Sequence, residues 1–270
     1  MMPHRSIVIT GASSGIGRAL ALAYAQPQNR LRLIGRNMER LAEVAAAVKA
    51  RGAEAEPVQL DVRDRIAMQD WLRQADAAHA IDLVIANAGI TTGLAPLAIT
   101  EDPEAVRAII ATNLGGVLNS VEPLILPMAA RRRGHIAVIG SIAGLISLPY
   151  SPAYCATKAA VHAYTTALRG RLEPRGLRVS LIIPGFVKTP LNDSITAFKP
   201  LEVSDAKAAA IIRRGLARGA ATIGFPWPLV LAARLGRLLP ARFVARVLSG
   251  FDVNVPETAE RVQRDMQDIV

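Results

Sequence analysis

The sequence predicts an α/β protein built on a doubly wound parallel sheet of about seven strands, with helices on both faces. Short runs rich in β-branched residues alternate with alanine-rich helical stretches over the first two-thirds of the chain. The predicted strands are continuously apolar, as expected for strands that are covered on both faces. A length of 270 residues fits one domain, residues 1–270, with a full core.

The elements can be placed in order along the chain. Strands are expected at residues 5–10, 31–35, 55–60, 81–86, 134–140 and 177–183, with a candidate last strand at 221–225. Crossover helices are expected at residues 15–25, 38–51, 64–78, 103–130 and 151–173. Pro123 and Pro127 lie inside the fourth helix, and proline removes a helix hydrogen bond, so we expect a kink or an early end there.

The charge of the chain allows several kinds of partner. A formal net charge of +10 would suit a nucleic acid, an anionic ligand or an anionic membrane. The arginines are scattered, with one tight run at residues 131–133, and aromatic residues make up 4% of the chain, too few to stack bases along a strand. No specific nucleic-acid partner is therefore expected.

Cysteine and histidine usage argues against a disulfide or a metal. Cys155 is the single cysteine, which excludes an intrachain disulfide and suits a reducing compartment. The four histidines show no metal-ligand spacing, so no metal is expected. The apolar run at residues 6–9 leaves no room for a signal sequence, and no stretch reaches the roughly 18 to 20 uncharged apolar residues of a spanning helix. We expect a cytoplasmic protein.

A glycine-rich turn follows the first strand and opens a helix. Gly15 stands four positions after Gly11, and Gly17 two positions further, a spacing that differs from the commoner G-x-G-x-x-G. Glycines let the backbone approach a pyrophosphate, and the N–H groups and positive end of a helix stabilise its charge. A tight turn without a ligand is the alternative, but the position in the first strand–helix unit favours dinucleotide binding. The expected contacts are Gly11, Ser13, Ser14, Gly15, Ile16 and Gly17.

The end of the second strand indicates which dinucleotide is bound. An acidic residue about 20 positions past the glycines usually holds the ribose 2′-hydroxyl of NAD, whereas an arginine accommodates the 2′-phosphate of NADP. Here the strand ends in Gly35 and Arg36, so the carboxylate is absent and a guanidinium is present. Arg36 could instead be a solvated surface residue, but a bidentate charge-assisted contact favours NADP(H) over NAD(H).

Tyr154 and Lys158 are candidates for proton transfer. They lie four positions apart on a predicted helix and so project from one face. A nearby ammonium would stabilise the phenolate and lower the tyrosine pKa, which would make Tyr154 a usable proton donor and acceptor. The pair alone is common on amphipathic helices. Ser141, just past the fifth strand, and Asn113 add polar groups near the carboxyl ends of the strands, where open parallel sheets bind ligands.

The whole set of motifs resembles the short-chain dehydrogenase/reductase family in its single-domain form, over residues 5–190. Besides the glycine turn, the resemblance rests on Asp61, Val62, Asn87, Ala88, Gly89, Asn113, Ser141, Tyr154, Lys158, Pro184, Gly185 and Thr189. It implies a Rossmann-like fold and hydride transfer between a nicotinamide and a carbonyl or secondary alcohol.

The resemblance also implies individual roles. Ser141 holds the substrate carbonyl, Tyr154 donates the proton, Lys158 contacts the nicotinamide ribose and tunes Tyr154, and Asn113 supports a water-linked proton relay. Further expected cofactor contacts are Asp61 and Val62 at the adenine, Asn87, Ala88 and Gly89 at the adenosine ribose, Val187 and Thr189 at the carboxamide, and Pro184 and Gly185. A helix cap is the alternative for Asp61, a turn residue for Asn87, and Cys155 is expected to be a small buried side chain rather than a nucleophile.

The last third of the chain departs from the family. Many members carry an Asp-Gly-Gly tail that helps to build a tetramer, and none occurs here, so a homodimer is expected. Residues 190–220 are expected to form a substrate lid and a helix capped by Ser204. Residues 226–251 form an apolar and basic extension that either packs on the domain or meets an anionic membrane. Peripheral membrane contact through 227–251 and a lipid-like substrate therefore stay open.

Two classes of function remain at this point. The first is an NADPH-dependent ketone reductase, or the alcohol dehydrogenase that runs in reverse, acting on a small carbonyl or alcohol. The second is a noncatalytic NADP-binding sensor or scaffold. Such a protein would not need Ser141, Tyr154 and Lys158 together.

Overall fold

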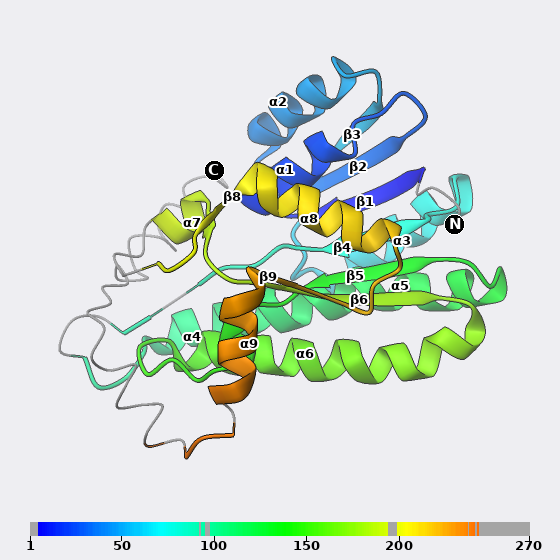
Figure 1. Cartoon of the computed structure of the whole chain (residues 1–270). Helices are drawn as coiled ribbons and strands as arrows, with labels where there is room; N and C mark the ends of the chain where they lie inside the picture. The colour runs from blue at the N-terminus through cyan, green and yellow to red at the C-terminus, as the bar shows by residue number, and fades with distance from the viewer. Residues whose placement is uncertain are drawn as a thin grey trace.

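A computed structural model describes residues 5–91, 93–94, 98–193, 199–236, 238–240 and 242. Its centre is a parallel sheet of seven strands (Figure 1). Their spatial order is β3 (Glu54–Gln59), β2 (Arg30–Gly35), β1 (Ser6–Thr10), β4 (Leu83–Ala86), β5 (His135–Ile139), β6 (Arg178–Pro184) and β9 (Thr222–Phe225). The order runs outward from β1 in both directions, so a switch point lies between β1 and β4, where such sheets bind ligands.

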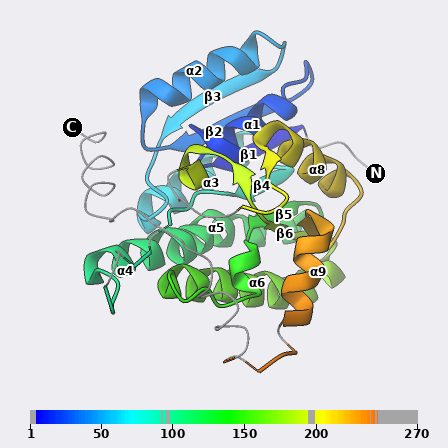
Figure 2. The same ribbon diagram turned by 60° about the vertical axis from the view of Figure 1, so that its left-hand side comes forward.

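Helices cover both faces of the sheet. They are α1 (Gly15–Ala23), α2 (Met38–Lys49), α3 (Arg65–Ala78), α4 (Pro103–Ile110), α5 (Gly116–Ala130), α6 (Pro152–Leu172), α7 (Pro190–Asp193), α8 (Asp205–Ala217) and α9 (Trp227–Gly236). Figures 1 and 2 place α1, α2 and α8 on one side, and α4, α5 and α6 on the other. A small parallel pair, β7 (Val187–Lys188) and β8 (Val203–Ser204), stands apart from the main sheet. The predicted doubly wound fold is confirmed.

The core forms two layers because successive strand residues point to opposite faces. In β1, Ile7 and Ile9 pack under α1 and α8, whereas Val8 packs with the cluster below α3, α5 and α6. All three are fully buried. The strands in the middle of the sheet are thus covered on both faces, as their apolar sequences predict.

Strand β3 differs from that prediction. It forms one edge of the sheet, and Glu54, Glu56 and Gln59 along it are exposed. Arg30 of the neighbouring strand pairs with Glu54 at 2.6 Å. An edge strand has solvent on one side, and charged residues there discourage pairing with another chain.

The helix expected at residues 103–130 is interrupted at another place than predicted. A π-helical segment, residues 111–115, separates α4 from α5, and α5 then continues through Pro123 and Pro127 to Ala130. The predicted early end at the prolines is wrong, because α5 is long enough to lose two N–H donors while Val117, Val121 and Leu124 hold it against the sheet. By length and composition the helical stretch 103–130 is long and apolar enough to span a membrane, and in this fold Val117, Val121 and Leu124 of its second half pack in the core.

The lid and the C-terminal extension are described in part. Residues 194–198 of the expected lid lie outside the described residues, as do 237, 241 and 243–251 of the extension. Ser204 caps α8, since its hydroxyl accepts the N–H of Lys207 at 3.2 Å, which confirms that prediction. Helix α9 packs on the domain through Val230, which joins Leu181 and Ile183 of β6.

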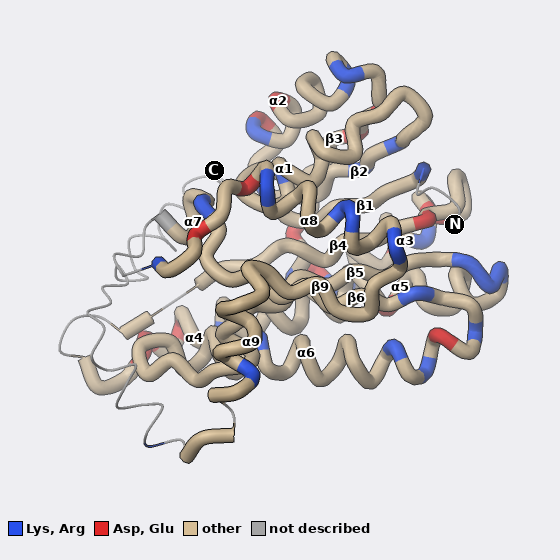
Figure 3. The backbone as a smooth tube through the Cα atoms, in the orientation of Figure 1, with Lys and Arg blue, Asp and Glu red and all other residues tan. Residues whose placement is uncertain are grey.

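Positive charge is spread over the fold. Figure 3 shows Lys and Arg on most helices and on the turn after α5, rather than along one helix. Several arginines are paired with acids, among them Arg131 with Asp76 and Arg133 with Asp82. Within the described residues, the charge forms no continuous stripe of the kind that tracks a nucleic-acid backbone.

Candidate active site

The glycine turn between β1 and α1 is tightly constrained. Gly11 and Gly15 have φ values of +64° and +51°, a left-handed conformation that favours glycine. A Cβ on Gly17 would lie 2.2 Å from the carbonyl oxygen of Gly11, so only glycine fits there. These glycines leave a backbone surface without side chains at the switch point of the sheet.

Asn87, just after β4, holds this turn in place. Its side-chain amide donates to the carbonyl oxygens of Thr10 at 2.9 Å and Gly11 at 3.2 Å. The Thr10 hydroxyl in return accepts the backbone N–H groups of Asn87 and Ala88, at 3.0 and 3.1 Å. The Asn87 amide thus shapes the glycine turn, and its predicted contact with the adenosine ribose stays a prediction.

The start of α1 suits an anion. Ser14 occupies the cap position with an extended backbone, its side chain makes no capping hydrogen bond, and the first turn contains no acidic residue. Ser14 is exposed and Ser13 and Ile16 are half-buried. The helix dipole and the first N–H groups therefore face a surface without a competing carboxylate, which fits a pyrophosphate.

The ends of β2 and β3 place Arg36 near Asp61. Arg36 is half-buried, and its charge is one of the influences that lower the pKa of Asp61. Burial raises that pKa, but hydrogen bonds from Arg63 outweigh burial and leave it below its ordinary value. Asp61 is not a helix cap, since Asp64 fills that position by accepting the N–H of Ala67. The neighbouring Val62 is buried against Gly116 of α5.

Tyr154, Lys158 and Ser141 converge at the carboxyl end of β5. Lys158 is 5% exposed and donates to the carbonyl oxygen of Ile139 at 3.0 Å. Its Nζ lies 5.7 Å from the centroid of the Tyr154 ring. The Ser141 side chain forms a hydrogen bond with Tyr154. The spacing predicted that the tyrosine and the lysine share a face, and the structure brings both to Ser141.

The electrostatics of this cluster differ from the expectation. Burial raises the pKa of Tyr154, the hydrogen bond from Ser141 opposes that rise, and Cys155 adds to it. Burial also lowers the pKa of Lys158 to about 8. The expected lowering of the tyrosine pKa by Lys158 is not found, because the ammonium is itself desolvated and is bonded to Ile139.

Asn113 lies in the π-helical segment and is fully buried. Its amide pairs with the backbone of Ile90 in both directions: Oδ1 accepts the N–H at 2.8 Å and Nδ2 donates to the C=O at 2.9 Å. A Cβ on Gly89 would lie 3.2 Å from Asn113 Oδ1 and 3.7 Å from Lys158 Nζ. Asn113, Gly89 and Lys158 are therefore neighbours.

The chain after β6 returns to the glycine turn. The side chain of Thr189 lies 3.2 to 3.3 Å from the position of a Cβ on Gly15. Thr189 and Val187 are buried, and the Gly185 N–H donates to Phe225 O at 2.7 Å. Pro184, Gly185, Val187 and Thr189 thus lead from the end of β6 to the start of α1.

Two further side chains of α6, Cys155 and His162, belong to this region. Cys155 is buried, accepts the N–H of Leu148 at 3.2 Å, and has its pKa raised by burial, so the expectation of a buried, unreactive side chain is confirmed. His162 was not singled out in the sequence, although it continues the four-residue spacing of Tyr154 and Lys158. Its Nε2 lies 3.3 Å from the backbone nitrogen of Ser141.

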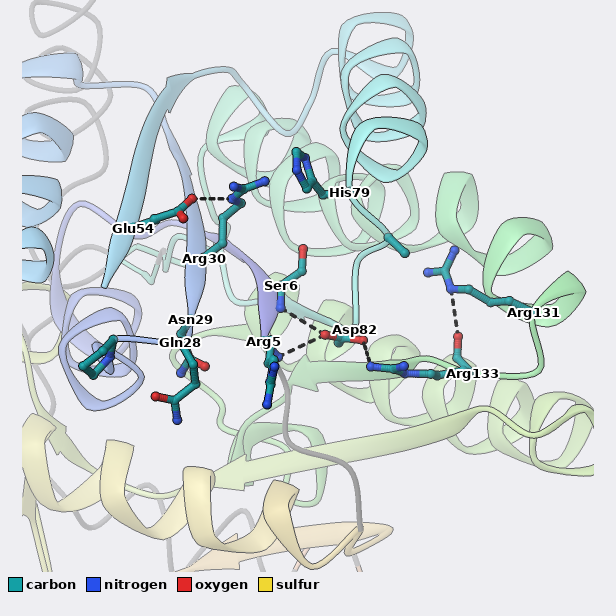
Figure 4. A pocket seen from close by; sticks show the side chains of 12 residues that line it. Arg5, Ser6, Gln28, Asn29, Arg30, Glu54, His79, Asp82, Arg131 and Arg133 are labelled. Atoms are coloured by element: carbon teal, nitrogen blue, oxygen red, sulfur yellow. Dashed lines mark hydrogen bonds and ion pairs between the residues drawn. The ribbon is translucent and has the colours of Figure 1, made fainter. Parts of the chain in front are cut away.

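A hollow lies at the opposite, amino-terminal ends of the strands (Figure 4). It has a volume of about 520 Å³, and its charged groups neutralise one another, with Arg30 on Glu54 and Arg133 on Asp82. The Asp82 carboxylate also accepts the N–H groups of Arg5 and Ser6, each at 3.0 Å. This hollow is shaped by structural ion pairs and is remote from the glycine turn.

Comparison with known proteins supports the resemblance to short-chain dehydrogenases. The family model described as short chain dehydrogenase matches residues 5–200. An uncharacterized oxidoreductase of Myxococcus xanthus is 37% identical over 242 residues, which cover 88% of this chain and 94% of the relative. Dehydrogenase/reductase SDR family member 7B of Bos taurus is 35% identical over 199 residues, which cover 71% of this chain and 61% of the relative.

Solved structures agree with the fold. A short chain dehydrogenase/reductase from Burkholderia phymatum in complex with NAD has a TM-score of 0.77 at 25% identity, covering 87% of this chain and 94% of the other. A short-chain dehydrogenase from Sphingobium yanoikuyae in complex with NADPH has a TM-score of 0.75 at 24% identity, covering 87% and 95%. The match over residues 5–200 and relatives above 30% identity show that the chain belongs to the short-chain dehydrogenase family of pyridine-nucleotide-dependent oxidoreductases.

Proposed function

We propose that the chain is an NADP(H)-dependent oxidoreductase that interconverts a carbonyl and a secondary alcohol, with Tyr154 as the proton donor and acceptor. The observation that carries the proposal is the convergence of Ser141, Tyr154 and Lys158 at the carboxyl end of β5. We treat residues 1–270 as one domain that both binds the dinucleotide and performs the chemistry.

The residues of the switch point fit a dinucleotide. Close packing against Gly11 O and Ala88 requires glycine at positions 17 and 11 and fixes the course of the turn, and the uncapped start of α1 offers N–H groups to a pyrophosphate. When bound, the nicotinamide supplies or accepts the hydride. Thr189 and Val187 would hold its carboxamide, and Asp61, Asn87 and Ala88 would line the adenosine half.

Ser141 and Tyr154 would act on the substrate oxygen. Ser141 Oγ accepts the N–H of Ala143 at 3.1 Å, which leaves its own proton to donate to the substrate oxygen or to Tyr154. Tyr154 is protonated at neutral pH, as an ordinary tyrosine is, and burial raises its pKa further, so it carries the proton that reduction consumes. In the oxidative direction the phenolate must form, and the hydrogen bond from Ser141 stabilises it.

Lys158 and Asn113 would resupply the proton. With a pKa lowered to about 8, Lys158 titrates close to neutral pH and can exchange protons there. Asn113 fixes the backbone of Ile90, the residue after Gly89. This contact keeps the carbonyl groups of the region in place for a water-linked proton relay.

Arg36 supports the preference for NADP(H). No carboxylate ends β2, where a carboxylate would repel a 2′-phosphate, and the guanidinium lies within electrostatic reach of Asp61 at the neighbouring strand end. A planar guanidinium binds phosphate in a bidentate fashion and adds about 1.5 to 3 kcal/mol for a charged hydrogen bond.

The substrate is proposed to be apolar. Ile142 and Leu145 lie one and four residues after Ser141 and pack with Leu181, Ile183 and Val230. Tyr150 is half-buried, and burial raises its pKa. Apart from the Tyr150 hydroxyl these side chains offer no hydrogen-bonding groups, so a bulky or lipid-like carbonyl fits them better than a sugar.

Helix α9 supports contact with a lipid surface. Val230 and Ala233 are buried, but Trp227, Leu231 and Leu235 on the other side are 71%, 46% and 55% exposed. Arg234 is exposed between them, and residues 226–251 contain no acid. We propose peripheral contact of 227–251 with anionic membranes, tested by co-sedimentation with phosphatidylglycerol vesicles against phosphatidylcholine vesicles.

The homodimer stays a prediction, tested by light scattering.

The central test is a carbonyl panel with acetophenone, 2-decanone and acetoacetyl thioesters, followed by loss of reduced-nicotinamide absorbance with NADPH or NADH. Tyr154→Phe should lower kcat by about 10²- to 10⁴-fold. Tyr164→Phe is the matched control, since Tyr164 lies on the same helix but packs into the core cluster with α5. Unchanged turnover in Tyr154→Phe would overturn the role of Tyr154 as proton donor, whereas no turnover by the wild type with any carbonyl of the panel would favour the noncatalytic sensor or scaffold. A preference for NADH would overturn the argument from Arg36.

A further inference from the structure

His162 lies on the face of α6 that carries the catalytic pair. It stands four positions after Lys158 and eight after Tyr154, so the three side chains follow one another along one side of the helix. The imidazole is 9% exposed and is enclosed next to the carboxyl end of β5. A polar ring at this depth needs hydrogen-bond partners.

The partner of Nε2 is the backbone of Ser141. The Ser141 N–H donates to His162 Nε2, with 3.3 Å between the two nitrogens. A backbone N–H can only donate, so Nε2 must carry no proton and the neutral ring holds its proton on Nδ1. The Ser141 N–H thus determines which imidazole nitrogen of His162 carries the proton.

Two glycines make room for the ring. A Cβ on Gly140 would lie 2.4 Å from His162 Nε2, and a Cβ on Gly144 would lie 2.7 Å from Cε1. Both distances are shorter than real Cβ contacts allow. The segment that contains Ser141 is therefore built around the imidazole, with a glycine on each side of it.

The backbone–backbone hydrogen bonds of this segment do not reach α6. Gly140 donates its N–H to Ile182 O at 2.8 Å, and Gly144 donates to Ser141 O at 3.0 Å. Neither bond ties Ser141 to α6. His162 links the Ser141 backbone to the helix of Tyr154, and this link fixes how the Ser141 hydroxyl meets the tyrosine.

We propose that His162 is a positioning residue that holds Ser141 in register with Tyr154 and the substrate oxygen. The proposal rests on the proposed function. His162 acts through Ser141 and does not touch the reacting atoms. Removing its acceptor leaves the Ser141 N–H buried and unpaired, so the segment shifts to find another partner.

Three variants separate the hydrogen bond from the packing. His162→Gln places an oxygen where Nε2 now lies, and His162→Met has the same length without a strong acceptor. His162→Asn is polar but too short to reach. We expect kcat of the Gln variant within about threefold of wild type, and a fall of about tenfold or more in Met and Asn, equivalent to about 1.4 kcal/mol. The KM for NADPH should not change, because the glycine turn is untouched.

Amide hydrogen exchange supplies a readout that needs no turnover. The Ser141 amide should exchange faster in Met and Asn than in wild type and Gln, while the Gly140 amide, bonded to Ile182, serves as the internal reference. If Met fails to fold, Asn decides, since it is smaller than histidine.

Equal kcat in Gln, Met and Asn, or Ser141 exchange that does not respond to the acceptor, would overturn the role of His162. Such a result leaves the Tyr154→Phe test intact, so failure of this inference is distinguishable from failure of the proposed function. If Tyr154→Phe keeps full activity, the exchange data alone still report whether His162 holds Ser141.

Discussion

Gly17→Ala provides the sharpest test of the glycine turn. The added Cβ would stand 2.2 Å from Gly11 O and 2.7 Å from Asn87 Nδ2. Real Cβ contacts are at least 3.0 Å, so the carbonyl must retreat by about 0.8 Å, the difference between the two distances. Gly11 O belongs to the backbone, and the Asn87 amide is held by its hydrogen bonds to Thr10 and Gly11. The turn therefore opens and strains the hydrogen bonds from Asn87 to Thr10 and Gly11.

The size of the effect follows from overpacking. Forcing extra volume into a packed site costs about 1 to 3 kcal/mol. For a chain of this size each kcal/mol lowers Tm by about 2 to 4 °C, so we expect a fall of about 6 °C. Displaced N–H groups should weaken NADPH binding by about 10- to 100-fold, the equivalent of one lost charge-assisted hydrogen bond. Differential scanning fluorimetry and titration calorimetry measure the two effects.

Gly170→Ala is the matched control. Gly170 lies in the exposed part of α6, and a Cβ there meets nothing within 4 Å. Alanine has the higher helix propensity, so this variant should gain about 0.5 to 1 kcal/mol and bind NADPH as wild type does. The steric reasoning is refuted if Gly17→Ala keeps wild-type Tm and affinity, or if both alanine variants lose stability equally.

Three further outcomes are expected. Arg36→Asp should raise the KM for NADPH by about 10- to 100-fold and lower that for NADH, measured by initial rates; equal effects on both cofactors contradict a 2′-phosphate contact. Burial holds the pKa of Lys158 at about 8 in the folded chain, below its unfolded value of 10.5, so the unfolded chain binds more protons between these values and stability from this group rises with pH there. The free energy of unfolding in urea should therefore rise more from pH 7 to pH 10 in wild type than in Lys158→Met. A difference between the two proteins that does not change with pH would contradict the lowered pKa of Lys158. Asp76→Asn should cost about 3 kcal/mol in urea unfolding, because Asp76 is 8% exposed and its carboxylate accepts two bonds from Arg131; a loss under about 1 kcal/mol contradicts this.

The doubly wound parallel sheet and the polar residues at its carboxyl edge could be predicted from local patterns. Apolar runs that end in Gly11, Asn87 and Ser141 place polar or small residues at the carboxyl ends of parallel strands, and this edge is where the structure brings them together. Spacing alone put Tyr154 and Lys158 on one helix face, as observed.

Features that depend on distant contacts could not be predicted. The Asn87 side chain bonds to residues 76 and 77 positions earlier, so its use as a clamp for the glycine turn has no local signal. The pKa of Tyr154 depends on burial, which the helix pattern does not report. His162 had a signal in its four-residue spacing, but its partner, the Ser141 backbone, has no side-chain signature.

The π-helical segment at residues 111–115 constrains how the chain length can vary. Such a segment holds one more residue per turn than an α-helix, so deleting one residue there would produce a continuous helix. Each residue in an α-helix contributes a rotation of about 100°, and α4 would then turn by that amount relative to α5. Ala105 and Ile109, now fully buried, would move toward solvent, and the Asn113 amide would leave Ile90. This helix should therefore tolerate substitutions in the segment but not the deletion of a single residue.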